Sequence, residues 1–304
     1  MKDRIASVIV GQEQTVDLVL TAILANGHVL IEGVPGVAKT LLARLTARLI
    51  DADFSRVQFT PDLMPSDVLG TTVFNMKTNA FDFHQGPIFA DIVLVDEINR
   101  APAKTQAALF EVMEERQISI DGTTHRMGDL YTILATQNPV EQEGTYKLPE
   151  AQLDRFLMKI TMDYPSLEEE VNILERHHTN AALVKLDDIV PAITKEELLS
   201  LRAFMNQVFV DRTLLQYIAL TVQQTRTSKA VYLGASPRAS VAMLQSSKAY
   251  ALLQGRDFVT PEDIKFVAPY VLQHRLILTA EAEMEGYSPV KVTQRLIDKV
   301  EVPK

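Results

Sequence analysis

The sequence of 304 residues contains no cysteine. Disulfide bonds, thiolate catalysis and cysteine-ligated metal sites are therefore excluded, and a cysteine-free chain suits a reducing compartment, so we expect a cytoplasmic protein. No apolar run reaches the about 18 residues that a transmembrane helix needs, and residues 1–14 lack the apolar stretch of a secretory signal. We therefore expect no membrane span.

Positive charge is also scarce, because 30 lysines and arginines face 39 aspartates and glutamates, for a net charge of -9. An acidic chain is a poor general binder of nucleic acid, although a local basic loop is compatible with it. Apolar residues make up 47% and charged residues 23%, which is typical of globular proteins. The length is sufficient for two domains or for one large domain.

The first half of the chain alternates strand-like and helix-like patterns. The predicted strands cover residues 28–32, 56–60, 92–95, 131–136 and 157–162, and the predicted helices cover residues 39–50, 104–116, 150–155 and 166–178. Apolar strands that alternate with helices predict a parallel sheet covered on both faces. Ser166 and Glu169 have the spacing of a capping box. His177 and His178 close the same helix, where cations are favoured.

Strand patterns disappear after residue 193, and helical patterns replace them. Thr194 and Glu197 again have capping-box spacing, and Pro237 and Pro261 each follow a serine or threonine cap. The predicted helices cover residues 211–227, 237–253, 261–276 and 289–300. We expect an α/β core over residues 1–185 and a small all-α domain over residues 192–304, with the boundary inside residues 179–191, where periodicity is weak.

Two irregular insertions interrupt the first half. Residues 71–89 lie between the second and third predicted strands, and residues 117–127 alternate around Asp121-Gly122, which is a hairpin turn signal. Both segments are expected to project from the sheet. They are either surface decoration or loops that touch a substrate, and their pattern leaves both interpretations open.

The segment GVPGVAKT, residues 33–40, follows the first apolar strand and precedes a helical pattern. This is the order of a P-loop, in which backbone N–H groups and a helix dipole face phosphate oxygens. Gly33 and Gly36 permit the tight turn, Lys39 is expected to reach the β- and γ-phosphates, and Thr40 to ligate Mg²⁺. Ala38 stands where the usual pattern has glycine. Alanine carries no steric penalty there if the residue already has helical φ, and on that basis we expect a working loop.

Two carboxylates, Asp96 and Glu97, end the apolar strand at residues 92–95. Ligand sites lie at the carboxyl ends of parallel strands. Asp96 would hold Mg²⁺, directly or through water, and Glu97 would take a proton from the attacking water or orient it. Asn138 follows the next strand, where it either orients the same water or opens a turn before Pro139.

Two arginines fit phosphate chemistry from more distant segments. Arg155 ends a short predicted helix and is either an arginine finger toward a neighbouring subunit's nucleotide or a structural ion pair with Asp154 or Glu150. Arg238 lies in the first turn of a predicted helix, where a cation opposes the helix dipole. A phosphate partner would explain that position.

Together these stretches resemble the AAA+ ATPases, and more closely the MoxR family. The resemblance rests on VGQEQ (10–14), GVPGVAKT (33–40), residues 86–115, residues 135–156 and GASPRA (234–239). It implies a P-loop AAA+ core followed by a helical lid domain. The segment 71–89 would be the helix-2 insert and 117–127 the hairpin before sensor 1, both facing the pore of a hexameric ring.

The resemblance also implies a role for each candidate residue. ATP would be held by Val10, Gly11, Gln12, Gly33, Val34, Pro35, Gly36, Val37, Ala38, Lys39, Thr40 and Leu41, and Mg²⁺ by Thr40 and Asp96. The catalytic residues would be Glu97 of Walker B, Asn138 as sensor 1, Arg155 as the arginine finger and Arg238 as sensor 2. Whether Arg238 acts on its own nucleotide or on a neighbour's stays open.

The implied function is a Mg²⁺-dependent ATPase that remodels or matures partner protein complexes, in company with proteins that bear a von Willebrand A domain. A nucleic-acid motor and a nucleotide-gated scaffold without hydrolysis are the alternatives. The insertions favour a protein substrate, because residues 71–89 carry Lys77 against Asp82, and residues 117–127 carry Arg126 against Asp121. A loop that tracks DNA should be richer in lysine and arginine. The complete catalytic set argues against the scaffold.

Overall fold

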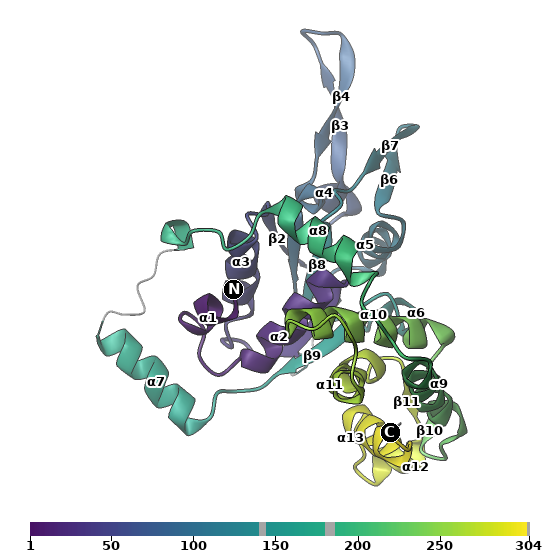
Figure 1. Cartoon of the computed structure of the whole chain (residues 1–304). Helices are drawn as coiled ribbons and strands as arrows, with labels where there is room; N and C mark the ends of the chain where they lie inside the picture. The colour runs from purple at the N-terminus through teal and green to yellow at the C-terminus, as the bar shows by residue number, and fades with distance from the viewer. Residues whose placement is uncertain (140–143, 180–185, 303–304) are drawn as a thin grey trace. The chain divides into compact units, whose positions relative to one another are not determined.

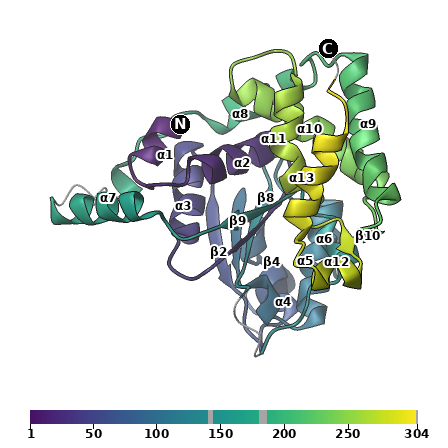
Figure 2. The ribbon, with the colours of Figure 1, turned by 90° about the horizontal axis from the view of Figure 1, so that it is seen from below.

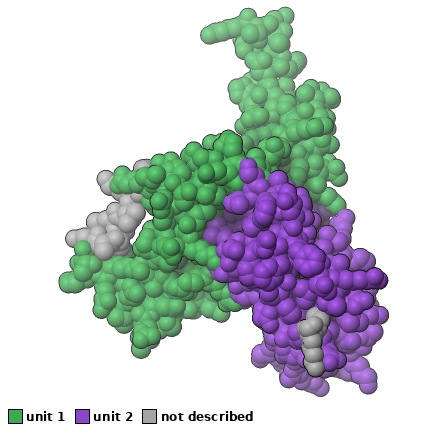
Figure 3. Space-filling view, in the orientation of Figure 1, with its two compact units in different colours: residues 1–16, 28–148, 161–199 green, residues 17–27, 149–160, 200–304 purple. Residues whose placement is uncertain are grey.

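The computed structural model describes residues 1–139, 144–179 and 186–302. The chain divides into two compact units (Figure 3). Unit 1 comprises residues 1–16, 28–148 and 161–199, and unit 2 comprises residues 17–27, 149–160 and 200–304. The predicted boundary at residues 179–191 includes residues 180–185, which lie outside the described residues, and the motif at 135–156 includes residues 140–143, which also lie outside them.

A five-stranded sheet with the order β2-β5-β8-β1-β9 is the centre of the fold (Figure 1). Its strands are β1 (Val29–Gly33), β2 (Phe54–Gln58), β5 (Ile92–Asp96), β8 (Thr132–Gln137) and β9 (Met158–Met162). The pairs β1–β8, β5–β8 and β2–β5 are all parallel. Every residue of β5 is buried, as expected for a strand covered on both faces. The predicted parallel α/β sheet is therefore confirmed.

Helices alternate with these strands along the chain (Figure 2). They are α1 (Lys2–Ala6), α2 (Glu13–Leu24), α3 (Lys39–Leu49), α4 (Pro65–Leu69), α5 (Ala103–Glu115) and α7 (Leu167–His178), with 3-10 turns at Pro87–Phe89, Ile98–Arg100 and Leu186–Asp188. Helix α3 packs against β2 and β5 through its apolar face. Helix α7 begins with the predicted capping box of Ser166 and Glu169.

Both insertions are β-hairpins that project side by side (Figure 1). The first consists of β3 (Gly70–Asn75) and β4 (Ala80–Gln85), and the second of β6 (Gln117–Ile120) and β7 (Thr123–Arg126). The second hairpin turns at Asp121 and Gly122, whose φ angles of 50° and 79° suit the predicted turn. The first insertion is regular rather than irregular, because its two strands pair without a break from Gly70 and Gln85 to Asn75 and Ala80.

The later part of the chain is helical, as expected for a lid domain. Its elements are α6 (Glu150–Leu153), α8 (Lys195–Met205), α9 (Arg212–Thr227), α10 (Pro237–Leu253), α11 (Pro261–Leu272), α12 (Ala280–Met284), α13 (Pro289–Lys299), and the strands β10 (Val231–Leu233) and β11 (Ile277–Leu278). Helices α9, α10, α11 and α13 pack together. The short antiparallel pair β10–β11 was not predicted, and α11 ends four residues early. Across the described ranges, no helix has the length and apolarity needed to cross a bilayer.

Candidate functional site

The glycine-rich loop joins β1 to α3, as the sequence predicts. A side chain at Gly33 would not fit, since a Cβ there would lie 2.8 Å from the carbonyl oxygen of Met162. Gly36 has a φ of 90°, which side-chain-bearing residues rarely adopt. These two glycines therefore set the path of the loop that brings Lys39 and Thr40 into the first turn of α3.

Ala38 departs from the expectation. It has φ 61° and ψ 23°, a left-handed conformation, and the helix begins only at Lys39. The condition of a helical φ at Ala38 is therefore not met. For an alanine the left-handed region costs about 1–2 kcal/mol, which accounts for the glycine that the usual loop has here.

The Lys39 ammonium lies inside the loop, where its Nζ donates to the carbonyl oxygens of Gly33 at 2.5 Å and Val34 at 3.3 Å. Burial lowers the pKa of Lys39 from its ordinary value, and the negative charges of Asp96 and Glu97 oppose that shift. The loop follows β1 and the two carboxylates lie at the end of β5, and because these strands are parallel both motifs are at the same edge of the sheet. The separate sequence motifs at residues 33–40 and 96–97 are thus brought together.

Asp96 is the last residue of β5, and both of its carboxylate oxygens have side-chain partners. Arg56 on β2 pairs with Oδ2 through its Nε at 2.6 Å, and the Thr136 hydroxyl on β8 donates to Oδ1 at 3.1 Å. Asp96 is 6% exposed, whereas the Arg56 side chain is 52% exposed. Strands on either side of β5 therefore hold this carboxylate in place.

Glu97 follows in a left-handed conformation with a φ of 56°. Its backbone N–H donates to the Thr136 hydroxyl at 3.0 Å. Its carboxylate accepts from Gln58 Nε2 at 2.8 Å and pairs with Arg100 Nε at 3.1 Å. Two side chains, Gln58 of β2 and Arg100 of the 3-10 turn that follows Glu97, therefore hold this carboxylate.

Arg56, Gln58 and Thr136 are the site residues that the sequence analysis missed. Arg56 and Gln58 alternate on β2 and therefore share a face, and Gln58 lies in register with Asp96. Two long polar side chains at alternate positions of a predicted strand were the available signal. Asn138, which was predicted, is buried directly after β8, at the same edge of the sheet as Asp96.

A pocket of about 250 Å³ adjoins the loop. It is lined by Val8, Ile9, Val10, Gln12, Gly36, Val37, Ala38, Leu41, Pro165, Ile173, Arg176 and His177. Val10 and Gln12 thus lie beside the loop as expected, and Gly11 between them lies against the Glu169 carboxylate, which leaves no room for a Cβ. Mostly aliphatic walls suit a flat apolar group such as a purine base.

Helix α7 forms one wall of this pocket through Ile173, Arg176 and His177. Arg176 ties the helix to the N-terminal segment, since its guanidinium donates to the carbonyl oxygens of Ala6 at 3.3 Å and Ser7 at 2.8 Å. His177, which the sequence suggested only as a favourable charge at the helix end, is therefore also a pocket residue.

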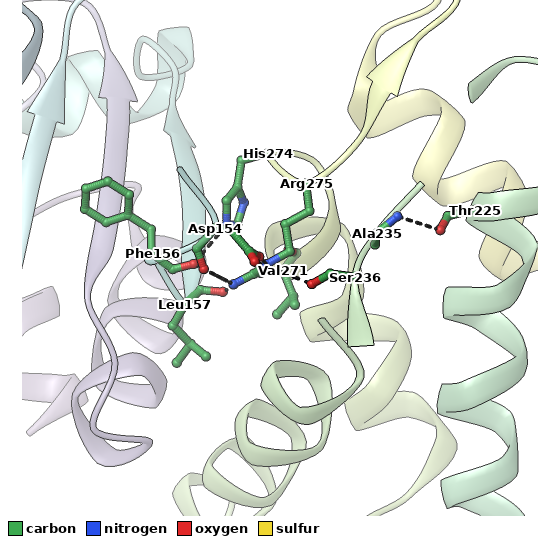
Figure 4. Close-up of polar contacts among 9 residues, drawn as sticks. All are labelled: Asp154, Phe156, Leu157, Thr225, Ala235, Ser236, Val271, His274 and Arg275. Atoms are coloured by element: carbon green, nitrogen blue, oxygen red, sulfur yellow. Dashed lines mark hydrogen bonds and ion pairs between the residues drawn. The ribbon is translucent and has the colours of Figure 1, made fainter. Parts of the chain in front are cut away.

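Arg155 and Arg238 belong to unit 2. Arg238 is exposed in the first turn of α10, and Arg155 follows α6. The neighbouring Asp154 is paired with the buried Arg275, whose Nε lies 2.6 Å from Oδ1 (Figure 4). The Ser236 hydroxyl, just before α10, donates to the other Asp154 oxygen at 3.4 Å.

The segment after α6 is fixed by two further groups of unit 2 (Figure 4). Arg275 donates to the carbonyl oxygens of Phe156 at 2.7 Å and Leu157 at 3.1 Å, and His274 Nε2 lies 2.9 Å from the Phe156 oxygen. Complete burial, assisted by the charge of Arg275, holds the pKa of His274 well below its ordinary value. These contacts explain why α11 ends at Leu272 rather than continuing through both residues.

Comparison with known proteins agrees with this geometry. Residues 28–158 match the ATPase family associated with various cellular activities (AAA), and residues 223–298 match the AAA lid domain. Chaperone MoxR1 of Mycobacterium tuberculosis is 44% identical over 98% of this chain and 80% of its own length. Protein MoxR of Methylorubrum extorquens is 30% identical over 92% and 87%, respectively.

The chain belongs to the MoxR family of AAA+ ATPases. A crystal structure of a Cytophaga hutchinsonii protein is 41% identical and superimposes on this MoxR-family chain with a TM-score of 0.90, covering 99% of this chain and 93% of that one. The resemblance drawn from the motifs is therefore confirmed, as is the AAA+ core with a helical lid. Nucleotide binding follows from membership of the AAA family.

Proposed function

We propose that this chain hydrolyses ATP to ADP and phosphate and couples the reaction to chaperone-like remodelling or maturation of partner protein complexes. The observation that carries the proposal is that the Lys39 ammonium lies in the field of Asp96 and Glu97, beside an apolar pocket. The printed name of Chaperone MoxR1 supports the chaperone-like part.

The residues present suit ATP with Mg²⁺. The pocket has the size and polarity for a base, and the loop amides and Lys39 suit phosphates. Thr40 and Asp96 supply the hard oxygen donors that Mg²⁺ prefers, so these two would hold the ion. When bound, Mg²⁺ neutralises charge on the phosphate oxygens.

Glu97 is the proposed general base, which would deprotonate the attacking water. Asn138 would orient that water. The Glu97 carboxylate is held by Gln58 and Arg100 in the present arrangement. Both contacts are made to Oε2, and a carboxylate has further lone pairs, so Gln58 and Arg100 can orient the base while it accepts a proton.

A homo-oligomeric, hexameric ring would supply Arg155 from a neighbouring copy to stabilise the charge on the transferred phosphoryl group. Arg238 would contact phosphate in its own or in an adjacent subunit. A protein with a von Willebrand A domain is the proposed partner class. The nearly balanced charges of the two projecting hairpins favour a protein substrate over nucleic acid.

Glu97→Gln tests the proposed reaction. This variant should bind ATP with wild-type affinity, because the amide keeps the shape of the side chain, and should hydrolyse it on the order of 100-fold more slowly or worse. Calorimetry measures the binding and phosphate release the turnover. Glu111→Gln, an exposed change on α5, is the matched control and should retain the wild-type rate. A wild-type rate in Glu97→Gln would show that the base is another group.

A further inference from the structure

A cleft of about 590 Å³ lies between the two projecting hairpins, and each hairpin forms one of its walls. On the first hairpin, Phe81 and Phe83 alternate along β4 and share a face, and Thr72 of β3 lies opposite Phe83. All three side chains line the cleft. The first wall is therefore largely aromatic.

The second wall combines apolar and polar groups. Ile120 and Thr123 lie opposite each other across β6 and β7 and share a face, and both line the cleft with Asp121 and His125. Asp121 contributes the only full charge among the described residues of the two walls, and that charge is negative. The hydroxyls of Thr72 and Thr123 add groups that can pair with peptide N–H and C=O.

Aromatic contacts close the cleft at its base. The rings of Phe83 and His125 have centroids 4.2 Å apart, and Phe89 packs edge-on against both. The opposite end stays open, because Phe81 is 72% exposed and Asp121 is also exposed. The Phe81 ring packs edge-on against Phe74, with centroids 5.2 Å apart, and a pair of exposed aromatic rings on a projecting hairpin is typical of a binding surface.

We propose that this cleft binds an extended polypeptide segment in which a large apolar side chain is next to a lysine or arginine. The apolar group lies between Phe81 and Ile120, and the cation pairs with Asp121. Nucleic acid fits poorly, since stacking platforms for bases are accompanied by cationic grooves, whereas no lysine or arginine lines this cleft among the described residues. This inference rests on the proposed function and adds the class of polypeptide that the protein recognises.

Fluorescein-labelled peptides test the proposal on the full chain by anisotropy. Three short glycine-serine peptides carry a central Phe-Lys, Phe-Glu or Ser-Lys pair, and the Phe-Lys peptide should bind best. Asp121→Asn, in which asparagine tolerates the left-handed turn, should weaken Phe-Lys binding by up to about fivefold and leave Phe-Glu binding unchanged or stronger. Phe81→Ser should weaken both phenylalanine peptides on the order of tenfold.

Two matched variants separate the cleft from general effects on the hairpin. Asp82→Asn changes the same charge on the opposite face of β4, where the Asp82 carboxylate accepts from Asn75. Met76→Ser removes an apolar side chain that is 89% exposed at the tip and does not line the cleft. Both variants should bind all three peptides as the wild type does. All four changes are at exposed positions, so far-ultraviolet circular dichroism should report an intact fold.

Three outcomes would overturn the inference: equal affinity for all peptides, equal effects of Asp82→Asn and Asp121→Asn, or displacement of the Phe-Lys peptide by an oligothymidine. Phosphate release by the wild-type chain is measured separately. Hydrolysis without peptide discrimination would contradict this inference alone. Peptide discrimination without hydrolysis would instead contradict the proposed function alone.

Discussion

Ala38 holds a left-handed backbone conformation directly beside the lysine that is expected to contact phosphate. The residue type opposes the conformation, and the surrounding loop and helix must compensate for the strain. The motif could be recognised from its letters, but the φ angle of Ala38 could not, because it is set by where α3 starts relative to β1.

Ala38→Gly should therefore stabilise the protein. Relief of the left-handed strain exceeds the extra entropy of glycine in the unfolded chain, so the free energy of unfolding should rise by roughly 0.5–1 kcal/mol. Urea denaturation measures this change. Ala47→Gly, inside α3 where the backbone is helical, should do the opposite. A less stable Ala38→Gly would contradict the left-handed assignment.

The ion pair between Arg56 and Asp96 has a consequence for metal binding. A cation at the proposed Mg²⁺ ligand repels a second cation, so Arg56 should lower the affinity of the site for divalent ions. Arg56→Gln should raise the Mn²⁺ affinity of the protein–ADP complex on the order of tenfold. Electron paramagnetic resonance of free Mn²⁺ gives that affinity without any turnover.

The sign of the change separates two roles of Arg56. Weaker Mn²⁺ binding in Arg56→Gln would mean that the arginine serves to orient Asp96 and does not compete with the ion. Arg44→Gln is the control, because Arg44 is exposed on α3, and it should leave the Mn²⁺ affinity unchanged.

Residues that belong to a recognisable sequence motif were predictable. Residues on other strands that contact such a motif were not. Asp96 and Glu97 stand out because two carboxylates end an apolar run. Thr136 is the second-to-last residue of β8 and gains its role only through the β5–β8 pairing, which places its hydroxyl 3.1 Å from Asp96. Strand order is a long-range property, and a single sequence does not contain it.

At the scale of elements, a single sequence likewise did not predict the hairpin β3–β4, the pair β10–β11 or the end of α11. The hairpin β3–β4 has the alternation of a strand pair, but its turn lacks the short Asp-Gly signal that made β6–β7 predictable. The pair β10–β11 has three and two residues and is too short for a periodicity argument. The end of α11 depends on contacts of His274 and Arg275 with the segment after α6.

The buried His274 makes the stability of that segment depend on pH. Its folded pKa is depressed by burial and Arg275, whereas in the unfolded chain it protonates near pH about 6.5. The stabilising contribution is fully present above that pH and is lost as the pH falls toward the folded pKa, at up to about 1.4 kcal/mol per pH unit. Stability should therefore decline steeply in weak acid.

His274→Gln should flatten this decline, since an amide can keep the hydrogen bond to the Phe156 carbonyl but cannot be protonated. Urea midpoints at a series of pH values from about 7 to 5 provide the measurement. His178→Gln, an exposed position at the end of α7, should keep the wild-type slope. Parallel slopes for His274→Gln and the wild type would assign the acid sensitivity to other groups.

For the whole molecule, the proposed ring makes Arg155 a test of assembly. Arg155→Ala should retain its nucleotide affinity, because the ATP site of the chain is unchanged. Its turnover rate should fall on the order of 1,000-fold, because no guanidinium reaches the neighbouring subunit's nucleotide. Phosphate release in mixtures measures the effect. Arg212→Ala, an exposed arginine of α9, should keep wild-type turnover.

Mixing decides whether the arginine acts across subunits. Lys39→Ala has an intact Arg155 but lacks the lysine that is expected to contact phosphate. Arg155→Ala has that lysine but lacks the arginine. Mixed rings should regain turnover that neither variant has alone. If no mixture is active, the role of Arg155 in a neighbouring site is wrong, whatever the activity of the wild type.

Family membership was the most predictable property of the molecule, because it depends on several motifs whose joint occurrence by chance is improbable. GVPGVAKT alone would have left the nucleotide site uncertain. The stretch that ends in Asp96 and Glu97 and the stretch around Asn138 are expected to supply independent parts of the same site, and both lie within residues 28–158, which match the AAA family. The relation between neighbouring copies leaves no comparable local pattern.

The pocket beside the glycine-rich loop is assembled from residues 8–12, 36–41 and 165–177, which are far apart in the chain. A ribosome makes the loop long before it makes α7, and domains form as their segments emerge. Strand β1 lies between β8 and β9 in the sheet, so even the loop gains its supporting neighbours only after residues 132–162 have been made. Capture of a base would come late in biosynthesis, once His177 has emerged, so that partly made chains would not compete for the cell's nucleotides.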